Sequence, residues 1–154
     1  MLRYPHTALV SIYDTQEPEK SFYYKELYAL LNERRPEESI SHKIMPTRQE
    51  HNVFCDSKPY KEWFVIQNSV HQVVGTLYVT NRNEIGISIF VQFRGQKYAS
   101  SALYNLLEYY PNETFFANVN PENEKSIDLF TKFGFSYIQN TYRREPIVMH
   151  ETVE

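Results

Sequence analysis

A short polar stretch between two apolar segments carries the residues best suited to binding an anion. Arg94, Gly95 and Lys97 stand between an apolar run that ends at Val91 and a helical pattern that continues to Tyr109. The first turn of a helix leaves backbone N–H groups without partners, and the helix dipole makes that end partly positive. This arrangement suits a phosphate or diphosphate group; an ordinary strand–loop–helix with two surface cations has the same pattern.

Candidate groups for proton transfer lie outside this stretch. Glu84 follows a turn sequence at the start of an apolar run, where it is either a general base or a solvent-exposed turn residue. His51 either lines a binding pocket or lies on an exposed helix face. Cys55 is interpreted as a small apolar residue, because no basic cluster in the sequence would activate it. The histidines show no spacing typical of metal ligands, so no metal site is predicted.

Several strands and helices must position these residues. Apolar runs predict strands over 8–13, 63–67, 72–80, 84–91, 114–119, 135–141 and 147–150. Apolar residues at helical spacing predict helices over 20–34, 47–54 and 95–109, and a last helix that begins at Asn120 and Pro121 and ends at Gly134. The sequence therefore predicts an α+β (mixed α/β) fold, with a central, mostly antiparallel twisted sheet of about 6–7 strands flanked by about 4 helices.

Three local patterns make predictions for individual residues. Over 84–91, isoleucines and Val91 alternate with Gly86, Ser88 and Phe90, a period of two that places Val91 in the strand. The sequence has 4 glycines, and each is expected where a side chain is excluded or a special backbone angle is needed. Thr47 is followed three residues later by a glutamate, which predicts a capping box at the start of a helix.

Composition and charge exclude several classes of function. The 154 residues include 16 basic and 19 acidic side chains, a net charge of −3, which argues against a broad nucleic-acid surface. No apolar run approaches the roughly 20 residues of a membrane span, and the first residues lack the apolar core of a signal peptide. With a single cysteine, Cys55, these features predict one domain over 1–154, a cytoplasmic location, and no nucleic-acid or membrane partner.

Two motifs resemble those of the GNAT superfamily of N-acetyltransferases. The acetyl-CoA-binding motif of that family is Gln or Arg, two residues, Gly, one residue, then Gly or Ala. Arg94 fills the first place and Ala99 the last, whereas Lys97 stands where Gly is usual. The segment 123–135 resembles the closing block of the family, which begins with Asn and ends in Gly-Phe. The motifs occur in the family's order within residues 75–142, and the predicted order of elements is GNAT-like.

The resemblance implies an acyltransferase that takes acetyl-CoA as its acyl donor. The end of the strand before the motif would pair with the pantetheine arm, and the helix N-terminus would bind the diphosphate. The residues implied in cofactor binding are Ile89, Phe90, Val91, Arg94, Gly95, Gln96, Lys97, Tyr98, Ala99, Ser100, Asn123 and Phe130. A backbone N–H near Val91 would polarise the thioester carbonyl, and Glu84 stands where several members of the family carry a catalytic Glu.

One position departs from the family in a way that affects the chemistry. Phe130 stands where the family usually has a Tyr that protonates the leaving thiolate, and Phe cannot donate a proton. Another tyrosine or water must then serve, and the tyrosines nearby in sequence are Tyr98, Tyr104, Tyr137 and Tyr142. The same departure favours a rival interpretation, in which the chain binds acyl-CoA without catalysis.

The acceptor site is expected between the first helix and the central strands, with His51 and Tyr78 as substrate-binding residues. This region is similar to bacterial GNAT proteins associated with surface-polysaccharide and amino-sugar synthesis, which implies a nucleotide-linked amino sugar as acceptor. More broadly, the resemblance implies a small-molecule amine as partner, with a protein or peptide amine as the alternative. A homodimer is a further expectation.

Overall fold

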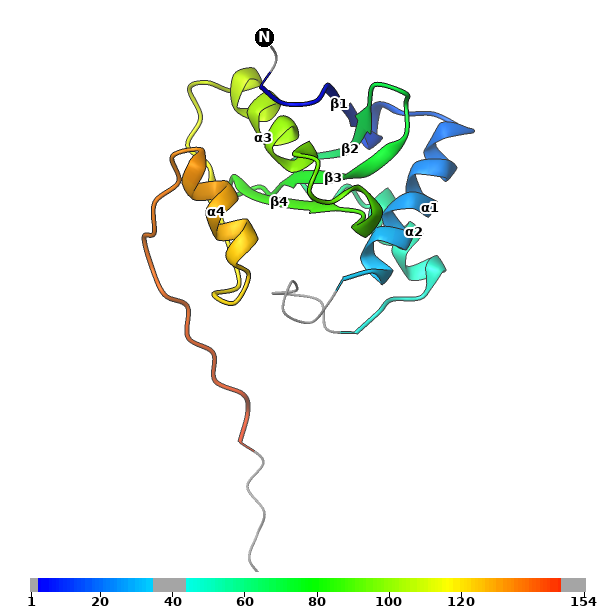
Figure 1. Ribbon diagram of the computed structural model, residues 1–154. Helices are drawn as coiled ribbons and strands as arrows, with labels where there is room; N and C mark the ends of the chain where they lie inside the picture. The colour runs from blue at the N-terminus through cyan, green and yellow to red at the C-terminus, as the bar shows by residue number, and fades with distance from the viewer. Residues whose placement is uncertain (1–2, 35–43, 148–154) are drawn as a thin grey trace, which may run out of the picture.

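A mixed sheet organises the described part of the chain, residues 3–34 and 44–147 of the computed structural model (Figure 1). In these residues the sheet has five strands in the order β1-β2-β3-β4-β5. Their bounds are Thr7–Ser11 (β1), Glu62–Asn68 (β2), Val73–Val79 (β3), Glu84–Ile89 (β4) and Phe116–Ala117 (β5). Neighbours from β1 to β4 are antiparallel, whereas β4 and β5 are parallel. This confirms the predicted mixed fold, with fewer strands than expected.

Helices cover both faces of the sheet (Figure 1). Helices α1 (Glu19–Asn32) and α2 (Arg48–Asp56) pack on one face, and α3 (Tyr98–Tyr109) and α4 (Glu124–Lys132) pack on the other. The 3-10 turns η1 (Ile12–Asp14) and η3 (Val91–Phe93) follow β1 and β4. No helix among the described residues is both long and apolar enough to cross a membrane.

Alternation along the strands divides the buried residues into two cores. In β2, Trp63 and Val65 face α1 and α2, whereas Ile66 faces α3, as the period of two requires. The predicted apolar stripe of α3 is confirmed, because Leu103 and Leu106 are fully buried in the second core. Both faces of the sheet are therefore covered, and β4 is held between two layers of side chains.

Local capping explains where two helices begin. The capping box at α2 is confirmed: Thr47 Oγ1 accepts the Glu50 N–H at 3.1 Å, and Glu50 Oε1 accepts the Thr47 N–H at 2.9 Å. The prediction that Asn120 and Pro121 open the last helix is wrong. Asn120 instead forms a turn with Glu122, and Asn123 caps α4 by accepting the Ser126 N–H at 3.2 Å.

One strand prediction, for the segment that follows the last helix, is wrong. The segment 135–141 forms no strand, and it leaves the body as an extended segment beyond α4 (Figure 1). The physical reason is that β5 has only two residues, so its outer edge offers few backbone groups for pairing. Exposed apolar side chains such as Tyr137 and Ile138 contribute nothing to the core there. Most of the predicted strand 147–150 lies outside the described residues.

The end of β4 also differs from the sequence pattern. Val91 is 57% exposed and begins the turn η3, so the predicted alternation holds only as far as Ile89. The expectation for the glycines is confirmed at all four positions. A Cβ at Gly75 or Gly86 would lie within about 2.2 Å of a neighbouring atom, and Gly95 and Gly134 have positive φ.

Candidate active site

Strands β4 and β5 pair over a short stretch only, and a cleft opens beside them. The two strands pair only through Glu84 with Phe116 and Ile85 with Ala117. Beyond this point a cleft of about 920 Å3 is lined by β4, the loop before α3, the first turn of α3 and α4. A parallel pair that separates in this way leaves one edge of β4 without a strand partner.

Backbone groups of β4 face this cleft. The Phe90 N–H donates to the Val74 carbonyl at 2.9 Å, so Phe90 is bonded towards β3. Because alternate residues of an antiparallel strand direct their backbone groups to opposite sides, the N–H and C=O groups of Ile87 and Ile89 face the cleft. The Ile89 carbonyl already accepts Arg94 Nε at 3.0 Å. An extended ligand in the cleft could pair with this edge as an added strand does.

The predicted thioester donor near Val91 is engaged elsewhere. The Val91 N–H donates to Glu33 Oε1 at 2.9 Å, and Val91 lies in η3 rather than in β4. Residues 89–91 were predicted to pair with the pantetheine arm. Of these three residues, only Ile89 has its backbone N–H and C=O groups facing the open cleft.

The N-terminus of α3 is shaped to present backbone N–H groups. Gly95 and Lys97 both have left-handed φ angles, of 79° and 68°, which turn the chain sharply before the helix begins at Tyr98. Lys97 makes no side-chain cap, and the first internal bond of the helix runs from the Ser101 N–H to the Lys97 carbonyl. The N–H groups of Tyr98, Ala99 and Ser100 come before that bond and have no acceptor within the helix, so they can bind an anion. Gln96 is exposed outside the cleft lining.

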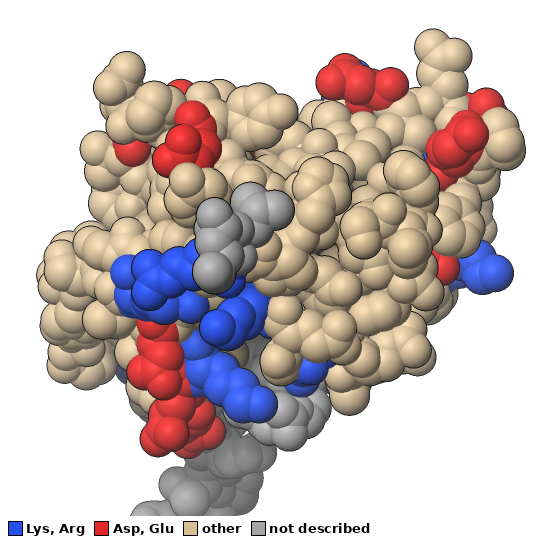
Figure 2. Space-filling view, turned by 45° about the horizontal axis from the view of Figure 1, so that its top comes forward, with Lys and Arg blue, Asp and Glu red and all other residues tan. Residues whose placement is uncertain are grey.

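A lysine from α4 joins the same site, and the sequence patterns did not identify it. Lys132 Nζ donates to Ser100 Oγ at 2.8 Å, which brings its ammonium to the first turn of α3. Arg94, Lys97 and Lys132 all line the cleft. Figure 2 shows one face of the molecule on which Lys and Arg side chains gather, with acidic side chains beside them. Only the packing of α4 against α3 brings Lys132 here, so no spacing rule could have found it.

We expect the Lys132→Met variant to bind acetyl-CoA about three- to tenfold more weakly, because it loses a charge-assisted contact to phosphate. Titration calorimetry at low salt measures the change, and the Lys25→Met variant on the exposed face of α1 is the control. Equal dissociation constants for the Lys132→Met variant and the unmodified protein would remove Lys132 from the phosphate site.

A second, smaller pocket lies on the other side of β4. It has a volume of about 260 Å3 and lies between α1, α2 and the sheet. His51 lines it and is buried, so the interpretation of His51 as an exposed helix residue is wrong. Its Nε2 donates to the Tyr24 carbonyl at 3.0 Å and lies 3.5 Å from Cys55 Sγ. Burial raises the pKa of the Cys55 thiol to about 12, which fits its interpretation as an apolar residue.

Protonation of His51 should reduce the stability of the protein. Burial lowers the pKa of His51 below its ordinary value of 6.5, so the unfolded chain binds a proton more readily than the folded one. The stabilising contribution is fully present above that ordinary value and is lost as the pH falls towards the folded pKa. In urea denaturation, we expect a lower free energy of unfolding at about pH 5.5 than at about pH 7.5. The difference should shrink in the His51→Gln variant but not in the exposed His6→Gln control; an unchanged difference would contradict this.

Tyr78 lies where the two cavities meet. Its ring stacks on Tyr60, with ring centroids 4.1 Å apart and an interplanar angle of 11°. It also covers Gly86: a Cβ there would lie 2.0 Å from Tyr78 Cζ and 2.4 Å from its hydroxyl oxygen. Tyr78, Ile87 and Ser88 line both cavities. Since no described residue forms a hydrogen bond with the Tyr78 hydroxyl, this group is available as a donor at the junction.

The other tyrosines considered from the sequence are less well placed. Tyr104, Tyr137 and Tyr142 are 47%, 75% and 90% exposed. Tyr98 lines the cleft at its far end, in the first turn of α3. Phe130 is buried against Phe135, with ring centroids 5.1 Å apart. Tyr78 is distant from the motifs in sequence, and only the pairing of β3 with β4 brings it to the site.

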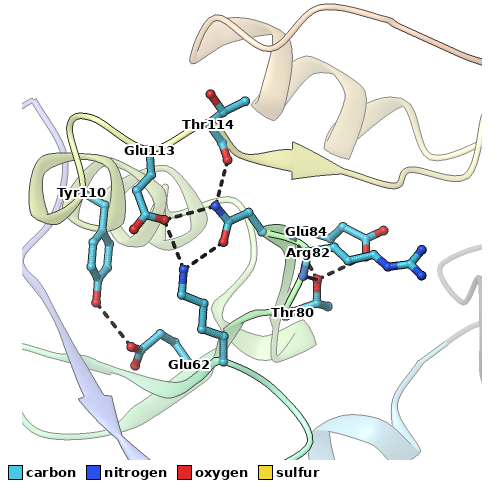
Figure 3. Close-up of polar contacts among 9 residues, drawn as sticks. Glu62, Thr80, Arg82, Glu84, Tyr110, Glu113 and Thr114 are labelled. Carbon is cyan, nitrogen blue, oxygen red and sulfur yellow. Dashed lines mark hydrogen bonds and ion pairs between the residues drawn. The ribbon is translucent and has the colours of Figure 1, made fainter.

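Glu84 lines the cleft at the start of β4 and is held by neighbouring side chains. Its carboxylate accepts a hydrogen bond from the Thr80 hydroxyl at 3.1 Å (Figure 3). It also accepts a hydrogen bond from the Asn118 side-chain amide. Its own N–H donates to Thr80 Oγ1 at 3.0 Å. It stands three residues from Ile87, about 10 Å along the strand, so it reaches the junction only through water.

A polar network fixes the β3–β4 turn beside Glu84 (Figure 3). Lys61 Nζ contacts Asn83 Oδ1 at 3.1 Å and Glu113 Oε2 at 3.4 Å. Asn83 Nδ2 donates to the Thr114 carbonyl at 3.1 Å. These contacts tie the segment before β5 to the start of β4, which holds the closed end of the cleft. Among the described residues no group of three metal-ligating side chains is found.

The fold and the site together indicate a protein that binds an extended, phosphorylated carrier molecule. The open backbone edge of a strand can pair with the extended part, and the helix N-terminus that follows can bind the phosphates. The sequence matches the family model described as acetyltransferase (GNAT) domain over residues 10–136. The chain therefore belongs to the GNAT acetyltransferase family and is an acetyl-CoA-dependent acyltransferase.

Solved structures share the fold. A spermidine N-acetyltransferase from Vibrio cholerae in complex with CoA and spermine has a TM-score of 0.71 and 16% identity, covering 86% of this chain and 82% of that one. A protein assigned provisionally as a phosphinothricin N-acetyltransferase has a TM-score of 0.66 and 17% identity, covering 85% and 84%. A dodecameric form of the spermidine enzyme has a TM-score of 0.62 and 16% identity, covering 87% and 80%. No curated protein sequence matches the chain.

Proposed function

We propose that the protein transfers acetyl from acetyl-CoA, bound between β4 and β5, directly to a primary amine of a small molecule. The observation that carries this proposal is the meeting of two cavities at one strand. The lining residues that the large cleft and the smaller pocket share are Arg34, Phe54, Tyr60, Tyr78, Ile87 and Ser88. A thioester in the cleft and an amine in the pocket would approach each other there without a covalent intermediate on the protein.

On the donor side, the N–H groups of α3's first turn would bind the diphosphate, with Arg94, Lys97 and Lys132 adding positive charge. The open edge at Ile87 and Ile89 would pair with the pantetheine amides. Asn123 lines the cleft opposite this edge and caps α4 with its side-chain oxygen, so its amide nitrogen is the group left for the cofactor arm.

In the transfer, the amine nitrogen forms a bond with the acetyl carbonyl carbon and the carbon–sulfur bond breaks. The N–H of Ile87 or Ile89 would stabilise the developing oxyanion, a role that the engaged Val91 N–H does not fill in this structure. Glu84 would accept the amine proton through water, and the Tyr78 hydroxyl would donate a proton to the leaving thiolate.

A thiol-release assay with acetyl-CoA tests the proposal over a panel of amino sugars, nucleotide-linked amino sugars, polyamines, apolar amines and peptides. The proposal requires turnover of at least one small-molecule amine and binding of acetyl-CoA by calorimetry. Turnover of peptides alone would favour the protein-acetyltransferase alternative. Binding without turnover of any amine would favour an acyl-CoA-binding module.

A nucleotide-linked amino sugar is the acceptor that the sequence resemblance favours. The homodimer stays a prediction; a neighbour of similar fold assembles as a dodecamer.

A further inference from the structure

The smaller pocket has a lining that is mostly apolar and aromatic. Its walls come from the last turns of α1, from α2 and from the face of β2–β4 that carries Trp63 and Tyr78. The apolar and aromatic residues among its lining are Leu27, Leu30, Leu31, Ile44, Pro46, Phe54, Tyr60, Trp63, Tyr78 and Ile87. Three aromatic rings contact one another there: Tyr60 stacks on Tyr78 and meets Trp63 edge-on at 4.9 Å. Such a surface favours a flat, apolar ligand body.

The described residues that line this pocket include few charged side chains, one basic and one acidic. Arg34 and Glu50 are the charged residues among the described lining residues. The Glu50 carboxylate accepts the Thr47 N–H in the capping box and is exposed, so it lies at the rim. Burial keeps the pKa of His51 low, which leaves its imidazole neutral near pH 7. A ligand with several ammonium groups would find too few described carboxylates here to offset the cost of desolvation.

Size sets a further limit on the ligand. The pocket has a volume of about 260 Å3, against about 920 Å3 for the cleft. A volume at the small end of ligand sites suits a compact monoamine, whereas a nucleotide sugar would extend beyond it. Arg34, Tyr78 and Ser88, polar or charged residues that line both cavities, lie at the end that opens on the cleft, where an amine must be placed.

We propose that the acceptor is a compact monoamine carried on a flat aromatic or apolar body, rather than a polyamine or a nucleotide-linked amino sugar. This inference rests on the proposed function, because it assigns the smaller pocket to the acceptor. The apolar pocket also contributes to the chemistry: desolvation lowers the pKa of a bound ammonium and so favours the neutral, nucleophilic amine.

Trp63 provides a direct readout of pocket occupancy. It is the 1 tryptophan of the sequence, and it lines the pocket at 5% exposure. We expect 2-phenylethylamine to change the Trp63 fluorescence saturably without acetyl-CoA, and spermidine and a nucleotide-linked amino sugar to leave it unchanged. In thiol release, 2-phenylethylamine should exceed both others in kcat/KM by about tenfold or more.

A pair of variants at Leu31 tests the charge argument. Leu31 is a half-buried lining residue at the end of α1. The Leu31→Glu variant adds a carboxylate and should raise the kcat/KM ratio of spermidine to 2-phenylethylamine about tenfold. The Leu31→Gln variant has nearly the same size without the charge and should leave that ratio unchanged.

The outcomes separate this inference from the proposed function. Failure of acetyl-CoA to bind in calorimetry would overturn the proposed function and the inference with it. Binding of acetyl-CoA together with turnover of spermidine or a nucleotide-linked amino sugar in preference to 2-phenylethylamine would overturn the inference alone. A fluorescence response to 2-phenylethylamine, with the expected kcat/KM order and the Leu31→Glu shift, supports both.

Discussion

Replacing Tyr78 with phenylalanine should lower kcat by about 10²-fold or more while acetyl-CoA binding stays within about threefold of the unmodified protein. The substitution removes only the hydroxyl, so the stacking on Tyr60 and the packing over Gly86 persist. The loss arises because the thiolate would leave without a proton donor, since Phe130, which the sequence resemblance matches to the usual family tyrosine, has no hydroxyl. Steady-state kinetics with thiol detection measures kcat, and calorimetry measures binding.

The Tyr98→Phe variant is the matched control for this result. Tyr98 lines the same cleft but lies in the first turn of α3, so the loss of its hydroxyl should change kcat by less than about threefold. If the Tyr98→Phe variant loses the larger share of kcat, or if the Tyr78→Phe variant keeps full activity, the assignment of Tyr78 as proton donor is wrong.

Replacing Gly86 with alanine should have the second large effect. The new Cβ would lie 2.0 Å from Tyr78 Cζ, so the ring must move off its stacked position. A displacement of about 1 Å at a catalytic group costs about 10²-fold in rate, and the forced repacking should lower the free energy of unfolding by about 1–3 kcal/mol. Steady-state kinetics and urea denaturation measure the two effects separately.

A double variant distinguishes displacement of Tyr78 from general damage to the sheet. If Gly86→Ala acts through the Tyr78 hydroxyl, adding it to Tyr78→Phe should lower kcat little further, because the group that it displaces is already gone. Full multiplication of the two rate losses would show that the alanine disturbs β4 in another way.

The sequence predicted elements whose formation depends on local patterns. The stripe of α3 and the Thr47 capping box follow from spacing within one turn or a few, and both are confirmed. The residues at which a helix begins or ends were harder to predict. Asn120 with Pro121 has the composition of a helix start, yet the helix begins after Asn123, because an Asx-type turn uses Asn120 first.

Features that depend on contacts between distant segments could not be read from the sequence. Tyr78 was predicted in the acceptor site, but its place beside the cleft depends on the register in which β3 pairs with β4. Lys132 was not predicted, and it reaches Ser100 only because α4 packs beside α3. The segment 135–141 has apolar residues typical of a strand, but β5 is too short to pair with it. Similarly, Val91 fits a period of two, but its N–H bonds to Glu33 outside the sheet.

The central claim is that the cleft between β4 and β5 holds acetyl-CoA with its diphosphate on the first turn of α3. An amide NMR titration with acetyl-CoA tests it most directly, because each N–H in question gives its own signal. We expect saturable shifts of the amide signals of Tyr98, Ala99 and Ser100 and of Ile87 and Ile89, with the amide signal of Val10 in β1 unmoved. Shifts confined to other parts of the chain, or no shifts at saturating acetyl-CoA, would contradict it.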